Sequence, residues 1–326
     1  MRISVIIPAY NNAAGLPECL AAITRSAGPE DEVIVVDDAS TDETSAAAAR
    51  SGVQVYRAER NSGAGAARNL GAMHATGDVL LFIDSDVLAE PDTIGRVRRV
   101  LTARPEVVAV FGSYDDAPRA PNLVSQFRNL LHHFVHQNGE PEASTFWAGC
   151  GAVRRPAFET VGGFDIAGYT RAIEDIELGY RLRDAGYRIL LDRDLRVKHL
   201  KKWTFASFLL TDVVYRALPW SRLLRQRRLP LDHLNLKAEH RVSVALAVLI
   251  VMVLPLAALT PIALTLAAAA FAGLIVANRK LLAFFFRSRG LAFAVVAVPL
   301  LFLHYLASAI GYLWALVASP APRPTA

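Results

Sequence analysis

The sequence predicts an α/β domain with a mostly parallel sheet flanked by helices, followed by an α-helical transmembrane region. Two observations support this prediction. Short apolar runs alternate with helix-like segments over the first two thirds of the chain, which is the pattern of strands joined by crossover helices. The last third contains two stretches without charged side chains, 242–278 and 291–322, and a membrane span needs about 20 predominantly apolar residues.

The charge of the chain is distributed unevenly. Residues 1–195 carry 19 basic and 27 acidic side chains, whereas residues 196–326 carry 16 basic and 3 acidic ones, so the net charge of +5 describes neither part. The 53% hydrophobic content excludes a globally disordered chain. The only cysteines, Cys19 and Cys150, are too far apart for a disulfide scaffold or a cysteine-based zinc site. Nucleic-acid binding is not expected, because the basic surplus precedes apolar spans and the soluble part is acidic.

The expected strands and helices follow one another from the N-terminus. The strands cover 3–8, 32–36, 53–57, 79–83 and 107–111. The helices cover 16–25, a segment opening at Thr41 with Ser40 or Thr41 as its cap, 64–75, a segment with Pro91 in its first turn, and a segment from Glu174 to Gly186. Ligands of such sheets bind at the carboxyl ends of strands. Those ends carry polar groups: Pro8, Tyr10, Asn11, Asp37, Asp38, Asp84 and Asp86.

Two carboxylates follow the strand 79–83. Asp84 and Asp86 are two residues apart, so in extended geometry both side chains point the same way. Two such anions repel each other unless a cation or a proton joins them. A hard divalent cation, Mg²⁺ or Mn²⁺, bound partly through substrate phosphates, fits this chemistry. An isolated Asp-x-Asp is usually a solvated turn, but the hydrophobic strand before it makes a binding site as plausible an interpretation.

Other polar groups have a structural interpretation beside a functional one. Asp37 and Asp38 can accept hydrogen bonds from a base or a ribose, or cap a helix. Arg68 occupies the third glycine position of a dinucleotide fingerprint, which disfavours an NAD-dependent oxidoreductase; it can reach a phosphate or form a surface ion pair. Glu174 and Asp175 either complement the helix dipole or act in catalysis. A structural and a functional interpretation also remain for the bend 147–151, for His132, His133 and His136 on an amphipathic segment, and for His199 after a short strand.

The C-terminal third predicts about three transmembrane helices, 242–257, 260–278 and 291–318. Pro255 and Pro261 bracket a turn that makes the first two a hairpin, with a single long kinked helix as the alternative. Basic residues precede the first span and separate the second from the third, so three spans place both clusters on the cytoplasmic side. Residues 281–286 would suit an interfacial helix on anionic lipid.

Taken in order, the N-terminal motifs resemble those of the family 2 glycosyltransferases, inverting enzymes with the GT-A fold. The resemblance covers about residues 3–200 and lies in the set of motifs rather than in any single one. The matching segments are the opening strand 5–11, the strand end 35–40, the Asn-x-Gly…Ala-Arg-Asn segment 61–71, the Asp-x-Asp segment 82–86, the acceptor-side segment 146–154 and the Glu-Asp motif 173–175.

The resemblance implies an activity and a site. It implies that Asp84 and Asp86 hold a divalent cation, Mg²⁺ or Mn²⁺, on the donor diphosphate, with His199 as a third contact. It implies that Asp175, next to Glu174, takes a proton from the acceptor hydroxyl. The implied donor is a nucleotide-diphosphate sugar, UDP-linked, and the implied acceptor is lipid-linked or a glycan. Donor binding is implied for Pro8, Tyr10, Asn11, Asp37, Asp38, Arg68 and Asp84.

The expected organisation is a catalytic domain 1–200, a basic amphipathic membrane-surface segment 201–241, the spans within 242–318, and a tail 319–326. Within the second segment, an amphipathic helix over 203–218 would turn the active site towards a lipid-linked acceptor. No Gln-x-x-Arg-Trp motif follows the Glu-Asp helix, so single-sugar transfer is expected rather than polymerisation. The chain is expected in a bacterial-type inner membrane, with its catalytic domain cytoplasmic and a role in the cell envelope. The alternative is a non-catalytic, nucleotide-sugar-binding membrane module.

Overall fold

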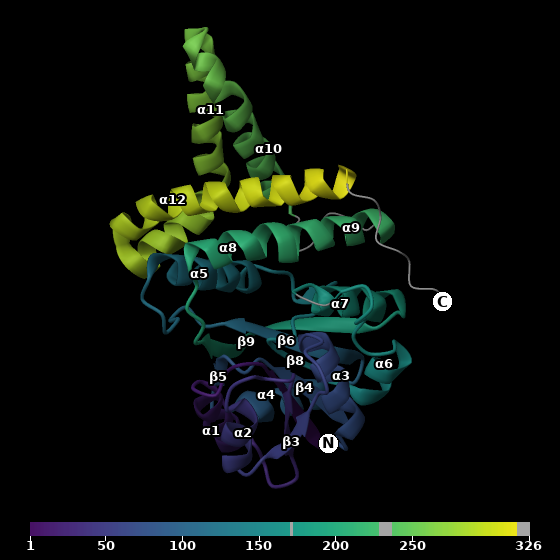
Figure 1. Ribbon diagram of the computed structural model, residues 1–326. Helices are drawn as coiled ribbons and strands as arrows, with labels where there is room; N and C mark the ends of the chain where they lie inside the picture. Colours follow the sequence, from purple (N-terminus) through teal and green to yellow (C-terminus); the bar gives the residue numbers. More distant parts are fainter. Residues whose placement is uncertain (170–171, 228–236, 318–326) are drawn as a thin grey trace. The chain divides into compact units, whose positions relative to one another are not determined.

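The computed structural model describes residues 1–169, 172–227 and 237–317 (Figure 1). The chain divides into two compact units. The first unit comprises residues 1–120 with 136–202, and the second comprises residues 121–135 with the segment that begins at Trp203. A short internal segment, 121–135, therefore packs with the C-terminal part of the chain.

The first unit is built on a nine-stranded sheet in the order β3-β2-β1-β4-β8-β6-β9-β5, with β7 paired to β9. The half formed by β3, β2, β1 and β4 is parallel, as the strand–helix alternation predicts. Strand β8 runs antiparallel to both β4 and β6, so the sheet as a whole is mixed. The strands are β1 (Ile3–Ala9), β2 (Glu32–Asp37), β3 (Gln54–Arg57), β4 (Val79–Ile83), β5 (Val87–Ala89), β6 (Val107–Tyr114), β7 (Glu142–Ala143), β8 (Cys150–Arg154) and β9 (Arg188–His199).

The helices of this unit start and end close to the predicted positions, with two corrections. The helix predicted to have Pro91 in its first turn begins at Thr93 with Asp92 as its N-cap, so Pro91 precedes it. The second helix begins at Thr44 rather than Thr41, because the Asp42 carboxylate accepts a hydrogen bond from the Thr44 N–H at 3.0 Å and closes a turn there. Ser40 and Thr41 therefore do not cap it. The helices are α1 (Leu16–Ser26), α2 (Thr44–Arg50), α3 (Ala64–His74), α4 (Thr93–Ala103), α6 (Arg155–Thr160) and α7 (Glu174–Asp184).

Helix α7 is seated close to the backbone of residues 145–146. A Cβ atom on Gly179 would lie 2.3 Å from the Phe146 nitrogen, so only glycine allows this approach. The helix ends at Gly186, whose φ of +81° lies in the left-handed region that favours glycine, as the sequence predicts. These two glycines hold the first turn of α7, with Glu174 and Asp175, beside the sheet.

The second unit is helical. It contains most of α5 (Leu123–Gln137), then α8 (Phe205–Leu210), a π-helical turn η1 (Thr211–Ala217), α9 (Leu218–Arg227), α10 (Ala238–Val253), a short 3₁₀ turn η3 (Leu254–Ala258), α11 (Pro261–Ala277) and α12 (Arg279–Val317). The amphipathic helix predicted over 203–218 is thus divided among α8, η1 and the start of α9. The tail 319–326 lies outside the described residues, as does the last residue of the predicted third span.

Two helical segments are long and apolar enough to cross a membrane, Ala238–Ala258 and Arg279–Val317, and α11 is apolar but only 17 residues long. Helices α10 and α11 pack against each other as a hairpin, since the Asn278 side chain donates to Ser243 Oγ at 2.9 Å across its base. These residues form two helices that turn back on each other, not one long kinked helix. Helix α12 is interrupted at Gly290, where φ is +82°.

Candidate active site

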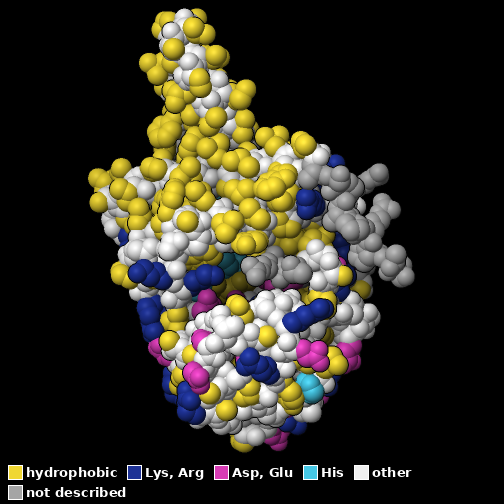
Figure 2. Space-filling view, viewed as in Figure 1, with side chains coloured by type: hydrophobic (Ala, Val, Ile, Leu, Met, Phe, Trp, Pro, Cys, Tyr) yellow, Lys and Arg dark blue, Asp and Glu magenta, His cyan; other side chains and the backbone are white. Residues whose placement is uncertain are grey.

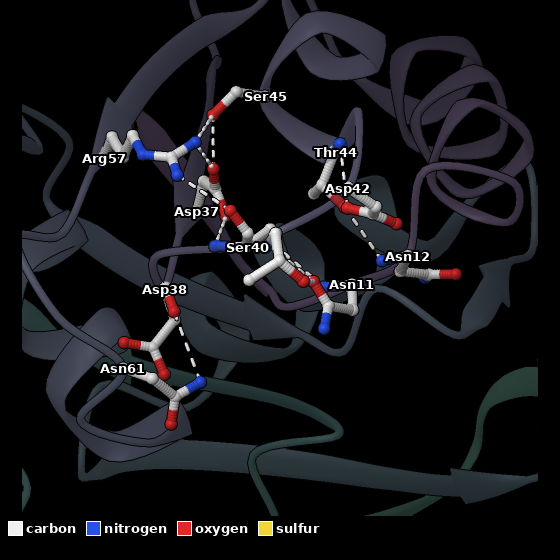
Figure 3. A network of polar contacts seen from close by, with 11 residues as sticks. Asn11, Asn12, Asp37, Asp38, Ser40, Asp42, Thr44, Ser45, Arg57 and Asn61 are labelled. Atoms are coloured by element: carbon white, nitrogen blue, oxygen red, sulfur yellow. Dashed lines mark hydrogen bonds and ion pairs between the residues drawn. The ribbon is translucent and has the colours of Figure 1, made fainter.

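The loop that follows β2 is organised by Asp37 (Figure 3). This carboxylate is fully buried; it accepts hydrogen bonds from the Ser40 N–H at 2.9 Å and from the Ser45 hydroxyl, and it pairs with Arg57 at 2.8 Å. Burial would raise the pKa of Asp37, but the hydrogen bonds from the two serines and the Arg57 charge outweigh it and lower that pKa. The structure therefore places Asp37 beneath the loop as its internal support.

Asp38 joins this loop to the start of α3. Its two carboxylate oxygens accept hydrogen bonds from the N–H groups of Ser62 and Gly63, at 2.9 and 2.8 Å. Asn61 donates to the Asp38 carbonyl at 3.2 Å, as Figure 3 shows. Asp38 thereby fixes the glycine-rich segment at the edge of the sheet where β1 and β2 end.

The end of β1 contributes exposed groups at the same edge. Tyr10 is 48% exposed, and Asn11 adopts a positive φ of 48° while its side-chain oxygen accepts from the Thr41 N–H at 2.8 Å. Ala39, at the end of the neighbouring strand, also has a positive φ, of 59°. Strained backbone at two adjacent strand ends is typical of ligand-binding loops.

Asp84 and Asp86 lie just after β4, with Asp84 next to the β8 backbone. The Asp84 N–H donates to the Gly149 carbonyl at 3.3 Å, and the Asn12 side chain donates to the Ser85 carbonyl at 2.9 Å, so the loop is held from two sides. Burial raises the pKa of Asp84, and the Asp86 charge adds to this, although Arg68 opposes both. Burial would also raise the pKa of Asp86, but the hydrogen bond and charge of His199 and the charge of Lys201 outweigh it and lower that pKa.

Arg68 joins Asp84 to the first turn of α7. Its guanidinium donates to Asp84 at 2.6 Å and to Glu174 at 2.9 Å, and its side chain is only 4% exposed. The surface ion pair considered for Arg68 is thus excluded: the pair is buried and bridges two elements. The Arg68 Nε and one Glu174 oxygen are buried without a hydrogen-bond partner.

Asp175 stands next to this bridge. Its carboxylate accepts hydrogen bonds from the Ile176 N–H at 2.8 Å and from the Ala148 N–H at 3.1 Å, so it faces the start of β8. Burial and the neighbouring Glu174 charge raise the pKa of Asp175 to about 7, although Arg68 and the two backbone donors oppose this. A carboxyl group with this pKa can exchange a proton near neutral pH.

His199, at the end of β9, lies next to Asp86. Its Nε2 lies 3.8 Å from Asp86, and its ring stacks on Tyr114 with the centroids 4.1 Å apart. Trp147 packs edge-on against Tyr114 at 4.9 Å. Tyr114 did not stand out in the sequence because it lies three residues beyond the predicted end of its strand. The stacking fixes the orientation of the His199 ring.

The residues at this site fit a divalent cation that is bound partly by the protein and partly by a substrate. Within the described ranges no group of three or more His, Cys, Asp and Glu side chains is arranged to hold an ion alone. Asp84 and Asp86 nevertheless offer two carboxylates on one short loop, and both side chains are partly exposed. A Mg²⁺-type ion is commonly held by one or two carboxylates together with substrate phosphates. The chemistry of this donor set agrees with that arrangement.

Two of the three clustered histidines, His133 and His136, have structural contacts. His136 makes a hydrogen bond of 2.9 Å with the Gly112 carbonyl and packs against Phe111 and Trp147. His133 stacks on Phe284 within the second unit, with the centroids 5.7 Å apart. The bend 147–151 brings Gly149 to the Asp84 N–H, so it borders the candidate site.

Comparison with protein families gives a direct match. Residues 4–162 match the family model Glycosyl transferase family 2. An uncharacterized glycosyltransferase of Haemophilus influenzae is 30% identical over 192 residues, which are 55% of this chain and 61% of that protein. An O-antigen chain rhamnosyltransferase of Salmonella typhimurium is 28% identical over 236 residues, 68% of this chain and 74% of that protein. The chain spans less than two thirds of the length of the first of these relatives.

Solved structures show the same fold. A mannosyltransferase from Pyrobaculum calidifontis, in complex with GDP-Man and Mn²⁺, superposes with a TM-score of 0.63 at 23% identity, covering 96% of this chain and 87% of that one. GalNAc-T7, with UDP, GalNAc and Mn²⁺, superposes with a TM-score of 0.51 at 16% identity, covering 71% and 52% of the two chains. At these identities the likeness concerns the fold, which is GT-A.

Proposed function

Because this chain carries a domain of glycosyltransferase family 2, we propose that it transfers one sugar residue from a nucleotide-diphosphate sugar to an acceptor, with inversion at the anomeric carbon. One observation supports this most strongly. The Arg68 guanidinium donates both to Asp84, a proposed contact of the sugar donor, and to Glu174, the chain neighbour of the candidate base Asp175. A single displacement needs a base on one side of the reacting carbon and a stabilised leaving group on the other.

Asp175 is the proposed base. Its pKa of about 7 lets it be ionised in the resting enzyme and still accept a proton from a hydroxyl that attacks the donor. The Ala148 and Ile176 N–H groups hold its carboxylate in place. Glu174, locked by Arg68, raises the proton affinity of Asp175 by its charge and keeps the helix turn in position.

Donor binding is proposed at the carboxyl ends of β1, β2 and β4. Asp84 and Asp86 would hold a divalent cation, with His199 behind Asp86, and such an ion would neutralise charge on the leaving diphosphate. Pro8, Tyr10 and Asn11 would border the nucleoside, and Asp38 would lie below it. We assign Asp37 a supporting role, because its carboxylate is enclosed by protein partners.

A membrane location is proposed for the second unit. Its apolar hairpin exposes a continuous hydrophobic surface (Figure 2), with Leu259 83% and Ile262 67% exposed, and an apolar surface of this extent is unfavourable in water. A lipid-linked acceptor in a bacterial-type inner membrane, with the catalytic unit on the cytoplasmic side, would agree with the basic residues that flank the hairpin.

Donor consumption tests the proposal directly. Purified protein in detergent with lipid extract is expected to release nucleoside diphosphate from a UDP- or GDP-linked sugar in the presence of Mn²⁺ or Mg²⁺. EDTA should abolish the release, and added Mn²⁺ should restore it, whereas Asp86→Asn should weaken Mn²⁺ binding measured by calorimetry. Donor binding without consumption, over a screen of donors and lipid extracts, would instead favour a non-catalytic binding module.

The pH dependence of the reaction provides a second prediction. A base with a pKa of about 7 is protonated, and so inactive, at lower pH. We expect kcat/KM to fall tenfold per pH unit below about pH 7 and to be level above it. Initial rates between pH 5.5 and 9 measure this profile. A rate that stayed constant down to pH 5.5 would contradict the role of Asp175.

A further inference from the structure

The apolar second part of α12, residues 291–317, lies along the charged helices of the second unit. His304 Nδ1 lies 2.6 Å from Asp212 in η1, and the Arg225 guanidinium of α9 donates to the Ala315 carbonyl. Between them, Gly311 packs so closely on Ala217 that an added Cβ would lie 2.4 Å from the Ala217 Cβ. The residue numbers of the contacting pairs increase in the same direction along both segments. Helix α12 therefore runs parallel to η1 and α9 (Figure 1).

The segment beside α12 is too charged to cross a bilayer. Helix α9 and the preceding η1 carry five ionised side chains over 17 residues, and α12 is packed against them along its length. Each charge at the centre of a bilayer costs about 2.5–3.5 kcal/mol. If α12 crossed the membrane, this segment would have to cross with it. The side chains concerned are Asp212, Arg216, Arg222, Arg225 and Arg227.

Helix α12 is instead suited to lie in the plane of the interface. One of its faces is buried on the protein through residues such as Leu301, Tyr305 and Ala315. Another face leaves Val295 and Leu313 59% and 56% exposed. A helix in the interface normally needs a polar face towards water. In α12 the face that would otherwise meet water is covered by the protein.

The α10–α11 hairpin has the features of a segment that enters the bilayer and returns. Helix α11, with 17 residues, is about 25 Å long, less than the roughly 30 Å of hydrocarbon. Its turn carries no charge. Pro255 and Pro261 have no N–H, and the Leu259 and Thr260 N–H groups bond to the Leu256 carbonyl at 2.9 and 3.1 Å. These two N–H groups are therefore satisfied within the turn itself.

We propose that none of the described segments crosses the membrane: the α10–α11 hairpin enters and leaves from one side, and residues 291–317 lie in the interface on hydrocarbon. This inference rests on the proposed membrane location. It replaces the third span expected at 291–318, and it places the end of the chain on the same side as the catalytic unit. The sequence alone indicated a third span because 291–318 is apolar throughout, while the charges that pack on it lie about 90 residues earlier.

Cysteine labelling in sealed, inside-out membrane vesicles tests this topology. The natural cysteines are buried, so single reporters can be added to the full chain at Met73 in the catalytic unit, at Leu259 in the hairpin turn, and at Ala326. With an impermeant maleimide, Met73→Cys and Ala326→Cys are expected to react equally in sealed vesicles, and Leu259→Cys only after detergent is added.

Three results would overturn the proposal. If Ala326→Cys reacted only after lysis while Met73→Cys reacted before it, residues 291–317 would cross the membrane. If Leu259→Cys reacted in vesicles of the opposite orientation, the hairpin would span the bilayer. If an alkaline carbonate wash released the protein, the membrane location itself would fail. Donor consumption measured in the same vesicles reports separately on the proposed transferase activity.

Discussion

Asp175→Asn is expected to lower kcat for sugar transfer by roughly 10²–10⁴-fold, the usual contribution of a positioned general base. The amide keeps the size of the carboxyl group and can still accept a hydrogen bond from the Ile176 N–H, but it cannot take a proton. Donor binding should remain within about twofold of the original value, because Asp175 is not among the residues proposed to contact the sugar donor. Transfer assays with labelled donor, together with calorimetric binding of the nucleoside diphosphate and Mn²⁺, separate the two effects.

A matched control lies on the same helix. Asp184→Asn changes an exposed carboxylate at the far end of α7 and should leave transfer unchanged. Transfer by Asp175→Asn at the original rate would exclude Asp175 as the base.

The thermal stability of Asp175→Asn shows whether its lost activity reflects the missing base or a misfolded protein. The folded-state pKa of Asp175 is raised to about 7 from 3.8, so between these values the folded state binds more protons than the unfolded one, and stability falls as pH rises. Asp175→Asn removes this fall. The variant should therefore be no less stable than the original protein at pH 8 in thermal unfolding.

The sequence predicted the parallel half of the sheet well, because each strand there is a short apolar run followed by a helix. β4 was predicted with the observed ends, 79–83, and the α7 pattern from Glu174 to Gly186 was also correct. The antiparallel placement of β8 was not predictable, because periodicity indicates which residues are buried but not which strand lies alongside. The start of α2 was missed for a local reason, the turn closed by Asp42.

The boundary between the two units could not be predicted from the sequence either. Residues 121–135 pack with the C-terminal helices through Phe127, whose ring lies 5.9 Å from those of both Phe208 and Phe285, and through a 2.6 Å pair between Arg128 and Asp212. These partners are about 80 to 160 residues away in the sequence. An amphipathic pattern indicates that a helix has an apolar face, but not what covers it.

Within the candidate site, the residue types were predictable but their connections were not. The order of motifs pointed to Asp84, Asp86 and Asp175 before any geometry was known. Arg68 was ambiguous, because its partner Glu174 is 106 residues away. Asp37 looked equivalent to Asp38 in sequence, yet Arg57 and two serines enclose it. Burial and pairing, which decide between a binding and a supporting carboxylate, depend on the tertiary structure.

Arg68→Met is expected to destabilise the protein by about 3–5 kcal/mol, the usual cost of removing one partner from a buried ion pair. Arg68 forms ion pairs with both Asp84 and Glu174, so its loss leaves the buried Glu174 charge without this counter-ion. For a unit of this size the melting temperature should fall by roughly 6–20 °C. The Arg68 charge also lowers the pKa of Asp175, so its loss should raise that pKa further. The fall of kcat/KM on the acid side of the profile should then begin at a higher pH.

Two further variants make this expectation specific. Arg99→Met removes an exposed pair with Asp92, in which both side chains are more than 60% exposed, and should cost less than about 1 kcal/mol. Adding Glu174→Gln to Arg68→Met removes one of the stranded charges and should restore part of the stability, with a coupling of about 0.5–3 kcal/mol. Thermal unfolding in detergent measures the original protein, these variants and the Glu174→Gln single variant, which the coupling energy requires. If Arg68→Met and Arg99→Met had the same melting temperature, the Arg68 bridge would not stabilise the site. Removing one partner of a buried ion pair costs more stability than removing one partner of a solvent-exposed pair.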